Sequence, residues 1–477
     1  MTRRVSDATQ NALPARKEAS QSSEPNRPFA RGGHLGTKLA ARAILWFGFY
    51  LLLVLFPLVI AWLRHPPEVE GRAFSMQFSA ACGYVAFGVM AFEFALIARL
   101  AFVSSAFGQD VLLQFHRQMG MVAALLVALH VVFVFKNGYP LTWLYPFGDG
   151  IIQWGTLAVY AVVLLIVLSL GRKKFRISYG WWQATHSLLA SSIIALVIVH
   201  VLKIGSFVGP LPMKELWALY LLLLIGLMLW FRLFKPFLMW RKPWEVVENV
   251  REHGGAQTIF LKPVGHSGFT FEPGQFAWLN TGKTPFNRDQ HPISLSSCAF
   301  DETGRDVGFT IKALGDWSSV TIPAIQPGTN IWLDGPYGVF SADREQGPGY
   351  ILIAGGVGVT PFYSMCATFA ERGDMRPVVL FYAGGTFESL TLREQLEALR
   401  DRMNLKIVYV LKDPYQGWIG ESGFITADVL QRHLPKQFQR MQYFICGPVP
   451  MMDAMEQILP EIGVPPEFIH TERFNMI

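Results

Sequence analysis

Two stretches of the chain decide its fold, FHRQMGMVAALLVALHVV (residues 115–132) and THSLLASSIIALVIVHVL (residues 185–202). Each is apolar enough to lie in a lipid bilayer, and each holds two histidines fourteen residues apart. The pairs are His116 with His130 and His186 with His200. Fourteen residues of α-helix return a side chain to within about 40° of its starting direction and advance it by about 21 Å. Each stretch therefore predicts two imidazoles on one helix face, one near each membrane surface.

The four histidines have a common explanation in two metal sites. The two stretches are the third and fifth of six apolar segments, so their helices run in the same direction, with His116 level with His186 and His130 level with His200. Two opposed imidazoles at each depth predict two bis-histidine iron sites stacked across the membrane. Because the chain has no CxxCH motif, each haem would be a non-covalently bound haem b. A packing role or a proton relay is the alternative for an intramembrane histidine.

The six apolar segments each have roughly twenty residues, enough to cross a bilayer core of about 30 Å. They are Ala43–Leu63, Gln77–Leu100, Val111–Phe135, Ile151–Leu170, Trp182–Ile204 and Leu216–Phe234. The sequence therefore predicts an all-α, six-helix membrane bundle at residues 43–235. It is preceded by a polar tail at residues 1–42, which we expect to be disordered and which is too long for a cleaved signal peptide.

Basic residues give the bundle an orientation. They gather in the tail, in GRKKFR (residues 171–176) and in FRLFKPFLMWRK (residues 231–242), whereas the alternate loops hold few. By the positive-inside rule, we expect both termini in the cytosol. The formal net charge of +6 mostly reflects this asymmetry, so we do not expect the protein to bind nucleic acid.

Two charged residues near the histidines allow more than one interpretation. Arg117, beside His116, could pair with a haem propionate, but a basic residue at the membrane boundary also fits the topology. Glu93, inside the second segment, could belong to a proton path, lie on the propionate side of a haem or face the bundle interior.

The part from about Arg241 to Ile477 has the pattern of a soluble α/β protein, with short β-rich runs between glycines and prolines. Two early motifs are PGQFAWL (residues 273–279) and HPISLSS (residues 291–297), in which Ser294 offers a hydroxyl and an amide to a flavin edge. A third, IKALGDWSSV (residues 311–320), is expected to open a helix whose free amides can hold a pyrophosphate. An ordinary capped helix is the alternative for this motif.

The strongest nucleotide signal is YILIAGGVGVTPF (residues 350–362). Its β-rich run ends in the glycines Gly355, Gly356 and Gly358. A helix is expected to begin at Thr360 and Pro361, so the backbone can approach a phosphate at the helix N-terminus. The motif is a variant of the dinucleotide-binding fingerprint.

The four cysteines are isolated in the sequence, so they predict no disulfide framework, zinc site or iron–sulfur cluster. Cys446 is the one with a functional interpretation. It stands with Gly447 in YFICGPVPMM (residues 443–452), at the carboxyl edge of a predicted strand, where open α/β sheets bind ligands. A buried core thiol is the alternative.

Taken in order, the paired histidines and the motifs HPIS, GDWSS, GPYG, AGGVGVTPF and CGP resemble the ferric reductase and NADPH oxidase family. In that family a six-helix di-haem membrane domain is fused to a dehydrogenase domain similar to ferredoxin–NADP reductase. The resemblance covers about residues 43–477. It implies a cytosolic FAD-binding β-barrel at residues 241–345 and a Rossmann-like α/β NAD(P)-binding domain at residues 346–477.

The resemblance also implies roles for individual residues. Around FAD it puts His291, Pro292, Ile293, Ser294 and Ser297, with Gly315, Trp317 and Ser318 in the phosphate region. Around the nicotinamide dinucleotide it puts Gly355, Gly356, Gly358, Thr360 and Pro361, with Cys446, Gly447 and Pro448 at the nicotinamide. Phe474 would cover the flavin ring until the nicotinamide displaces it. In the oxidases that aromatic residue is typically the last one, whereas three residues follow it here.

A second departure from the family concerns the choice of nucleotide. Many relatives place an arginine for the 2′-phosphate of NADPH after the strand that here reads VVLFYAGG, but this chain has Gly384, Gly385 and Thr386. Arg393 could substitute from the following helix. We therefore expect NADH to be accepted at least as well as NADPH.

The sequence thus predicts a transmembrane enzyme, an NAD(P)H oxidase or ferric reductase. Electrons would pass from cytosolic NADH or NADPH through FAD to the haem of His116 and His186, and then to the haem of His130 and His200. The resemblance favours dioxygen as the acceptor, giving superoxide, with a ferric chelate or a periplasmic redox protein as alternatives. We expect it in a bacterial inner membrane.

Two other classes of protein remain as alternatives. A non-catalytic haem sensor or haem-storage protein would show no NAD(P)H-driven haem reduction. A proton-coupled transporter with histidine relays would be colourless, and it leaves the dehydrogenase half unexplained.

Overall fold

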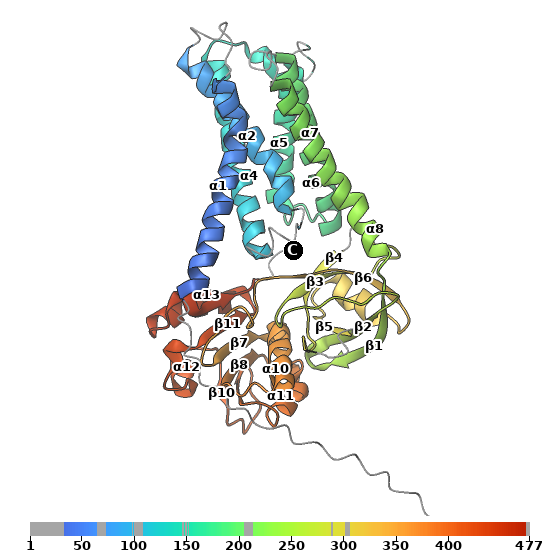
Figure 1. Ribbon diagram of the computed structural model, residues 1–477, viewed down its shortest axis with the longest axis vertical. Helices are drawn as coiled ribbons and strands as arrows, with labels where there is room; N and C mark the ends of the chain where they lie inside the picture. Colours follow the sequence, from blue (N-terminus) through green and yellow to red (C-terminus); the bar gives the residue numbers. More distant parts are fainter. Residues whose placement is uncertain are drawn as a thin grey trace, which may run out of the picture.

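The structure is a computed structural model of the chain, and it describes residues 33–63, 73–97, 99, 108–145, 147, 150, 152–204, 213–287, 290–300 and 306–473. A bundle of long helices stands on two β-sheet domains that lie side by side (Figure 1). Strands β3, β4 and β6 of one sheet lie nearest to the bundle, and the N-terminal end of α1 points to this same end of the bundle (Figure 1).

The bundle is built from helices that follow the predicted apolar segments. They are α1 (Gly33–Leu63), α2 (Phe74–Ile97), α4 (Gln109–Lys136), α5 (Gln153–Gly171), α6 (Tyr179–Ile204) and α7 (Met213–Leu229). A π-helical turn, η3 (Trp230–Phe234), joins α7 to α8 (Lys235–Trp240), so the last helix continues six residues beyond its predicted end. A short 3-10 helix, η2 (Leu141–Leu144), lies between α4 and α5.

Five stretches are long and apolar enough to cross a membrane: Phe74–Ile97, Val111–Lys136, Gln153–Gly171, Gly180–Ile204 and Leu221–Trp240. The segment predicted at Ala43–Leu63 lies within α1, where Ile44–Val59 is a shorter apolar stretch, so the count of six spans stays a prediction. Helix α1 begins ten residues before the predicted start of its span, inside the segment expected to be a tail. Residues 1–32 lie outside the described part of the chain.

Helix α2 is the centre of the bundle. In its most apolar window 39% of the residues are buried, against 6% to 17% in the other four candidate spans. Small residues allow this close packing. A Cβ at Gly88 of α2 would lie 2.4 Å from the carbonyl oxygen of Val54, so the backbones of α1 and α2 approach each other here. The central position of α2 matters because its side chains reach the histidines of α4.

The first β-domain is a six-stranded antiparallel barrel. Its strands are β1 (Trp244–Glu252), β2 (Ala256–Pro263), β3 (Phe276–Asn280), β4 (Gln290–Ser294), β5 (Val307–Lys312) and β6 (Asn330–Tyr337), in the order β4-β3-β6-β1-β2-β5. A bridge between Leu295 and Phe309 joins the two ends of this order and closes the barrel. Inward-facing apolar side chains such as Val246, Ile259 and Leu279 are fully buried in its core.

The second β-domain is a parallel sheet in a doubly wound arrangement. Its strands are β7 (Tyr350–Gly355), β8 (Val378–Gly384), β9 (Leu405–Leu411), β10 (Glu421–Ser422), β11 (Gln442–Cys446) and β12 (Ile469–Thr471), in the order β10-β9-β8-β7-β11-β12. The helices are α10 (Thr360–Arg372), α11 (Arg393–Leu399), α12 (Ala427–His433) and α13 (Val449–Glu461). Because helices cover both faces, the central strands are continuous apolar runs. Membrane helices followed by an antiparallel and a parallel sheet confirm the predicted order of fold classes.

Candidate functional site

The histidines nearer the barrel form a close pair. His116 of α4 and His186 of α6 have ring centroids 6.2 Å apart, with their planes inclined at 67°. Two imidazoles that bind one metal ion from opposite sides, at about 2 Å each, need ring centres roughly 6 Å apart. The spacing of this pair therefore fits a shared iron ion. Gln183, one turn before His186, lines a small cavity together with Asp334 of the barrel, so this pair lies at the barrel end of the bundle.

Both rings of this pair are held at Nδ1. Oε2 of Glu93, on α2, is in direct contact with Nδ1 of His116. The hydroxyl of Ser169 lies 3.2 Å from Nδ1 of His186, and the Trp182 ring packs 5.2 Å from the same imidazole. Partners at Nδ1 orient a histidine so that Nε2 can bind a metal. Of the three interpretations of Glu93, the buried position and the contact with His116 agree with a side chain that faces the bundle interior.

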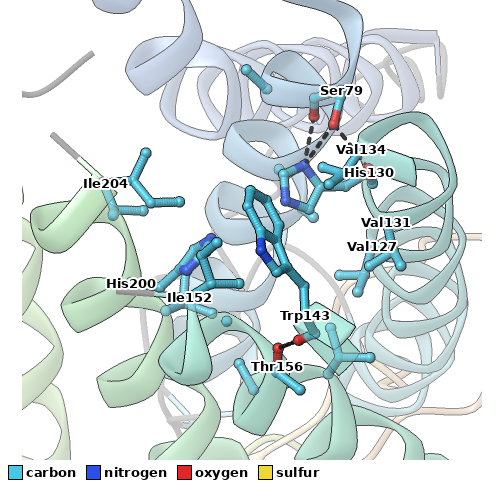
Figure 2. Close-up of a pocket in the computed structure, with 18 of the residues that line it drawn as sticks. Ser79, Val127, His130, Val131, Val134, Trp143, Ile152, Thr156, His200 and Ile204 are labelled. Atoms are coloured by element: carbon cyan, nitrogen blue, oxygen red, sulfur yellow. Dashed lines mark hydrogen bonds between the residues drawn. The ribbon is translucent and has the colours of Figure 1, made fainter. Parts of the chain in front are cut away.

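The second histidine pair shares a large cavity. His130 of α4 and His200 of α6 both line a space of about 640 Å³, which is within the usual size range of ligand pockets (Figure 2). Nδ1 of His130 lies 2.8 Å from the carbonyl oxygen of Ser79. Trp143 of η2 extends into the cavity near both histidines (Figure 2).

Two glycines make room for these rings. A Cβ at Gly155 would lie 2.5 Å from ring atoms of His200, and one at Gly83 would lie 3.1 Å from Nδ1 of His130. The cavity therefore depends on the absence of side chains at both positions. Neither glycine was predicted from the sequence, although a glycine inside an apolar span is a recognisable sign of close packing.

The walls of this cavity carry no formal charge. Among its described lining residues none is aspartate, glutamate, lysine or arginine. The hydroxyl of Thr156 donates to the carbonyl oxygen of Trp143 at 2.6 Å, and the hydroxyl of Tyr160 donates to that of Leu144 at 2.9 Å. These bonds fix η2 beside the cavity.

A charged cluster joins the bundle to the barrel. Arg99, which follows α2, and Lys235 of α8 contact Oδ2 of Asp334 at 3.2 and 2.8 Å. The hydroxyl of Tyr337 donates to Oδ1 of Asp334 at 2.6 Å, and the Arg99 guanidinium lies 3.5 Å from the centroid of the Trp278 ring. Burial and the nearby Asp334 raise the pKa of Tyr337, so its hydroxyl stays protonated. The sequence analysis missed this cluster, although Asp334 directly precedes the GPYG motif.

The predicted flavin motifs meet on one side of the barrel. Strand β4 carries His291, Pro292, Ile293 and the buried Ser294. The ring of His291 stacks on Trp317, with centroids 3.8 Å apart, so the HPIS and GDWSS motifs are brought together. The Ser297 hydroxyl accepts a hydrogen bond from the Gly308 amide, beside the bridge that closes the barrel.

The helix expected after GDWSS is short. It consists of a π-helical turn, η5 (Trp317–Thr321), and one α-helical turn, α9 (Ile322–Ala324). The Ser318 hydroxyl already accepts hydrogen bonds from the amides of Leu314 and Gly315, at 2.9 and 3.0 Å. The amides of Leu314 and Gly315, which precede the turn, are therefore already hydrogen-bonded within the chain.

The nucleotide motifs meet at the carboxyl ends of β7 and β11. After Gly355, the 3-10 turn η6 (Gly356–Val359) leads into α10, which begins at Thr360 and Pro361 as predicted. A Cβ at Gly358 would lie 2.4 Å from the carbonyl oxygen of Cys446, and one at Gly355 would lie 2.5 Å from Pro448. Gly356 has a φ of 54° and open space around it. The glycine motif and the CGP motif thus form one surface.

Cys446 is buried at this surface, with an exposed fraction of 2%. Burial, with a smaller contribution from Glu472, raises the pKa of its thiol well above the usual value, so the thiol is neutral. The position at the end of β11 agrees with the functional interpretation, and the burial agrees with the alternative of a core thiol. Phe474 lies outside the described residues.

Arg393 is held by its own loop. Its Nη1 donates to the carbonyl oxygen of Phe387 at 2.9 Å, and its guanidinium lies 4.1 Å from the Phe387 ring centroid. The glycines Gly384 and Gly385 and Thr386 lead directly into this loop after β8. The arginine is therefore engaged inside the loop.

Comparisons with known proteins match both halves of the chain. Residues 82–197 match the family model described as ferric reductase like transmembrane component, and residues 352–457 match the oxidoreductase NAD-binding domain. The two matches agree with the architecture of the ferric reductase and NADPH oxidase family, a membrane part followed by a flavin and NAD-binding part.

Several curated relatives are similar to part of the chain. NADH-cytochrome b5 reductase 1 of Debaryomyces hansenii is 35% identical over 141 residues, which is 28% of this chain and 49% of that protein. The reductase component of propane 2-monooxygenase from Mycolicibacterium goodii is 32% identical over 226 residues, 46% of this chain and 63% of that protein. A flavohemoprotein of Bacillus subtilis is 28% identical over 241 residues, 49% of this chain and 59% of that protein. The chain spans about half to three fifths of the length of these relatives.

Among solved structures, the FAD/NAD-binding domain of a nitric oxide dioxygenase from Vibrio cholerae has 22% identity and a TM-score of 0.43, over 48% of this chain and 97% of that chain. The cytochrome b5 reductase domain of Ulva prolifera nitrate reductase has 23% identity and a TM-score of 0.42, over 48% and 97%. The matched domains and the curated relatives identify the chain as an oxidoreductase, with a membrane part joined to an NAD-binding flavoprotein part.

Proposed function

We propose that this chain, a ferric reductase-like membrane domain fused to an NAD(P)H oxidoreductase domain, carries electrons from cytosolic NAD(P)H through FAD and two b haems to an acceptor outside the cell membrane. The observation that carries the proposal is the arrangement of the four histidines in two pairs along α4 and α6, His116 with His186 and His130 with His200. When bound, FAD would accept the hydride and the two irons would pass its electrons outward one at a time.

The four histidines would be the iron ligands. The 6.2 Å centroid separation of His116 and His186 suits two ligands on one iron, and the cavity between His130 and His200 suits a bulky planar group. Ligands on both faces of each iron would exclude a directly bound acceptor and favour electron transfer.

The dehydrogenase residues would bind and orient the two nucleotides. The amides after Gly355 and the start of α10 would hold the pyrophosphate of NAD(P)H, because Gly356 has open space around it and Gly358 lets the turn pack closely against Cys446. Cys446, Gly447 and Pro448 would form the wall at the nicotinamide. Strand β4 would present His291 to Ser294 to FAD, with Trp317 stacked on His291, and Phe474 would cover the flavin.

We infer that NADH is accepted at least as well as NADPH. No arginine follows β8 directly, and Arg393 is engaged with Phe387 instead of being directed to a 2′-phosphate. A curated relative is named an NADH-cytochrome b5 reductase.

We expect dioxygen, giving superoxide, to be the acceptor that takes electrons from the outer site. An anionic ferric chelate would find no cationic side chain among the described lining residues, whereas a small neutral molecule needs none. A ferric chelate and a periplasmic redox protein remain the alternatives. The location would be a bacterial inner membrane with six spans and both termini in the cytosol, which agrees with the start of α1 at the barrel end of the bundle (Figure 1).

The experiment is an absorption spectrum of detergent-purified full-length protein with FAD, before and after anaerobic addition of NADH or NADPH. We expect the spectrum of a b-type haem, which NADH or NADPH reduces. When air is readmitted, we expect a superoxide signal that superoxide dismutase abolishes. Reduced haem without superoxide, but with reduction of a ferric chelate, would favour the alternative acceptor. Absence of haem would overturn the proposal, and haem that NAD(P)H does not reduce would favour a sensor.

A further inference from the structure

Glu93 is an unusual residue for its position. It is the only acidic residue in the five candidate spans, and its exposed fraction is 7%. Acidic side chains inside a membrane are costly and persist where they have a partner and a function. Its partner here is His116, on the neighbouring helix α4.

The contact sets which nitrogen of His116 is available. Oε2 of Glu93 touches Nδ1, which leaves Nε2 as the free ring nitrogen. A carboxylate on the far nitrogen of a metal-binding histidine fixes the ring and makes it a stronger electron donor to the metal.

No carboxylate contacts Nδ1 of the other three histidines among the described residues. Nδ1 of His130 lies 2.8 Å from the carbonyl oxygen of Ser79, and Nδ1 of His186 lies 3.2 Å from the Ser169 hydroxyl. Nδ1 of His200 is buried and has no hydrogen-bond partner among the described residues. A carboxylate therefore contacts Nδ1 of one histidine at the barrel end of the bundle, and it contacts neither of the two histidines in the outer cavity.

We propose that Glu93 is a positioning residue for His116 and that its carboxylate makes the inner iron site lower in reduction potential than the outer one. The inference rests on the proposed function. A carboxyl group at Nδ1 makes the imidazole a more basic ligand, which stabilises the oxidised iron and lowers its potential. With both irons bound, one electron would pass in the favourable direction from the inner iron, which would become oxidised, to the outer iron, which would become reduced. The asymmetry of the ligands' partners thus directs electrons away from the cytosol.

The test is a spectroelectrochemical titration of the full-length holoprotein. The wild type should show two one-electron components with different midpoint potentials. Glu93→Gln keeps the shape of the side chain and replaces the carboxyl group by an amide, so it should raise only the lower of the two potentials. We expect the electron distribution between the two sites to shift about tenfold, which corresponds to about 59 mV for one electron. The matched control is Glu215→Gln at an exposed position in the first turn of α7, which should leave both components unchanged.

A second variant keeps the test decisive if Glu93→Gln loses a haem. His200→Leu removes an outer ligand, and the component that remains should be the lower-potential one of the wild type. Survival of the higher one would overturn the inference, as would two unchanged components in Glu93→Gln. Failure of the proposed function is a different result, because the wild type would then hold no haem or fail to reduce it with NADH.

Discussion

At the scale of single residues, the positions of the outer histidine rings depend on two neighbouring glycines. The ring of His200 occupies the space that a Cβ at Gly155 would need, at 2.5 Å, and the ring of His130 lies against Gly83 in the same way. A glycine inside a helix costs roughly 1 kcal/mol relative to alanine, so its presence here indicates a packing requirement.

Gly155→Ala should therefore displace the His200 ring and remove one of the two haems. Overpacking of this kind costs about 1–3 kcal/mol. The control is Gly120→Ala on α4, where a Cβ would meet nothing within 4 Å. Haem content per protein, measured by absorbance, should fall in the first variant and stay at the wild-type value in the second. Equal haem content in both would contradict the assignment of His200 as an iron ligand.

His470 predicts a dependence of stability on pH in the nucleotide domain. Burial lowers its pKa to about 4, with Nε2 lying 2.8 Å from Oε1 of Gln442 and Glu345 as the nearest carboxylate at 3.9 Å. In the unfolded chain its pKa is about 6.5, so acid protonates the unfolded state first. Stability is full above about pH 6.5 and falls as the pH drops toward 4, by about 2 kcal/mol between pH 7 and pH 5.

Hydrogen exchange of the β11 and β12 amides, corrected for the intrinsic pH effect, measures this loss in the intact protein. His470→Gln should reduce the difference in protection between pH 7 and pH 5. An unchanged difference would show that other groups cause the acid sensitivity.

At the scale of elements, we expect the loop between β8 and α11 to determine the choice between NADH and NADPH. A side chain at Gly385 would meet only the Ser389 hydroxyl, at an ordinary 3.6 Å, so the loop can accept one. Gly385→Arg should add a cation for a 2′-phosphate and raise kcat/KM for NADPH about tenfold, because a charged hydrogen bond contributes about 1.5–3 kcal/mol. The NADH value should change little. Gly385→Gln, which is long but uncharged, is the control, and an equal gain with glutamine would exclude the charge as the cause.

Periodicity and composition predicted most of the elements. The apolar runs predicted the membrane helices, and the glycine motif predicted the start of α10 at Thr360, because both signals are local. The helical segment predicted after GDWSS is present as η5 and α9. The predicted start of the first helix was wrong. Helix α1 begins at Gly33, inside the segment expected to be a tail, because a helix can extend beyond the apolar part that composition identifies.

At the scale of the whole molecule, the sequence could not predict how the dehydrogenase meets the bundle. Arg99 and Asp334 are 235 positions apart, and no periodicity relates residues at that separation. The histidine spacings could be predicted because each lies within one helix, whereas this junction exists only after the bundle and the barrel have assembled. We expect this junction to align the flavin side of the barrel with His116 and His186.

Asp334→Asn tests this alignment, because it leaves the cations of Arg99 and Lys235 together without their carboxylate. Removing one partner of a buried charge pair costs about 3–5 kcal/mol, here at the contact between domains. NADH-driven reduction of a soluble acceptor such as ferricyanide depends on the dehydrogenase alone and should persist. Reduction of the haems by NADH should slow at least about tenfold, equivalent to about 1.4 kcal/mol in the barrier.

The matched control for Asp334→Asn is Glu272→Gln, which breaks the ion pair with Arg344 at the barrel surface. It should leave both rates unchanged. Stopped-flow absorbance follows the haem rate and a steady-state assay follows ferricyanide. If Asp334→Asn slowed both reactions equally, the carboxylate would support the barrel itself. If it slowed neither, the bundle and the dehydrogenase would be aligned by the chain connection through α8 and by the remaining contacts, and the charged cluster would have no part in electron transfer.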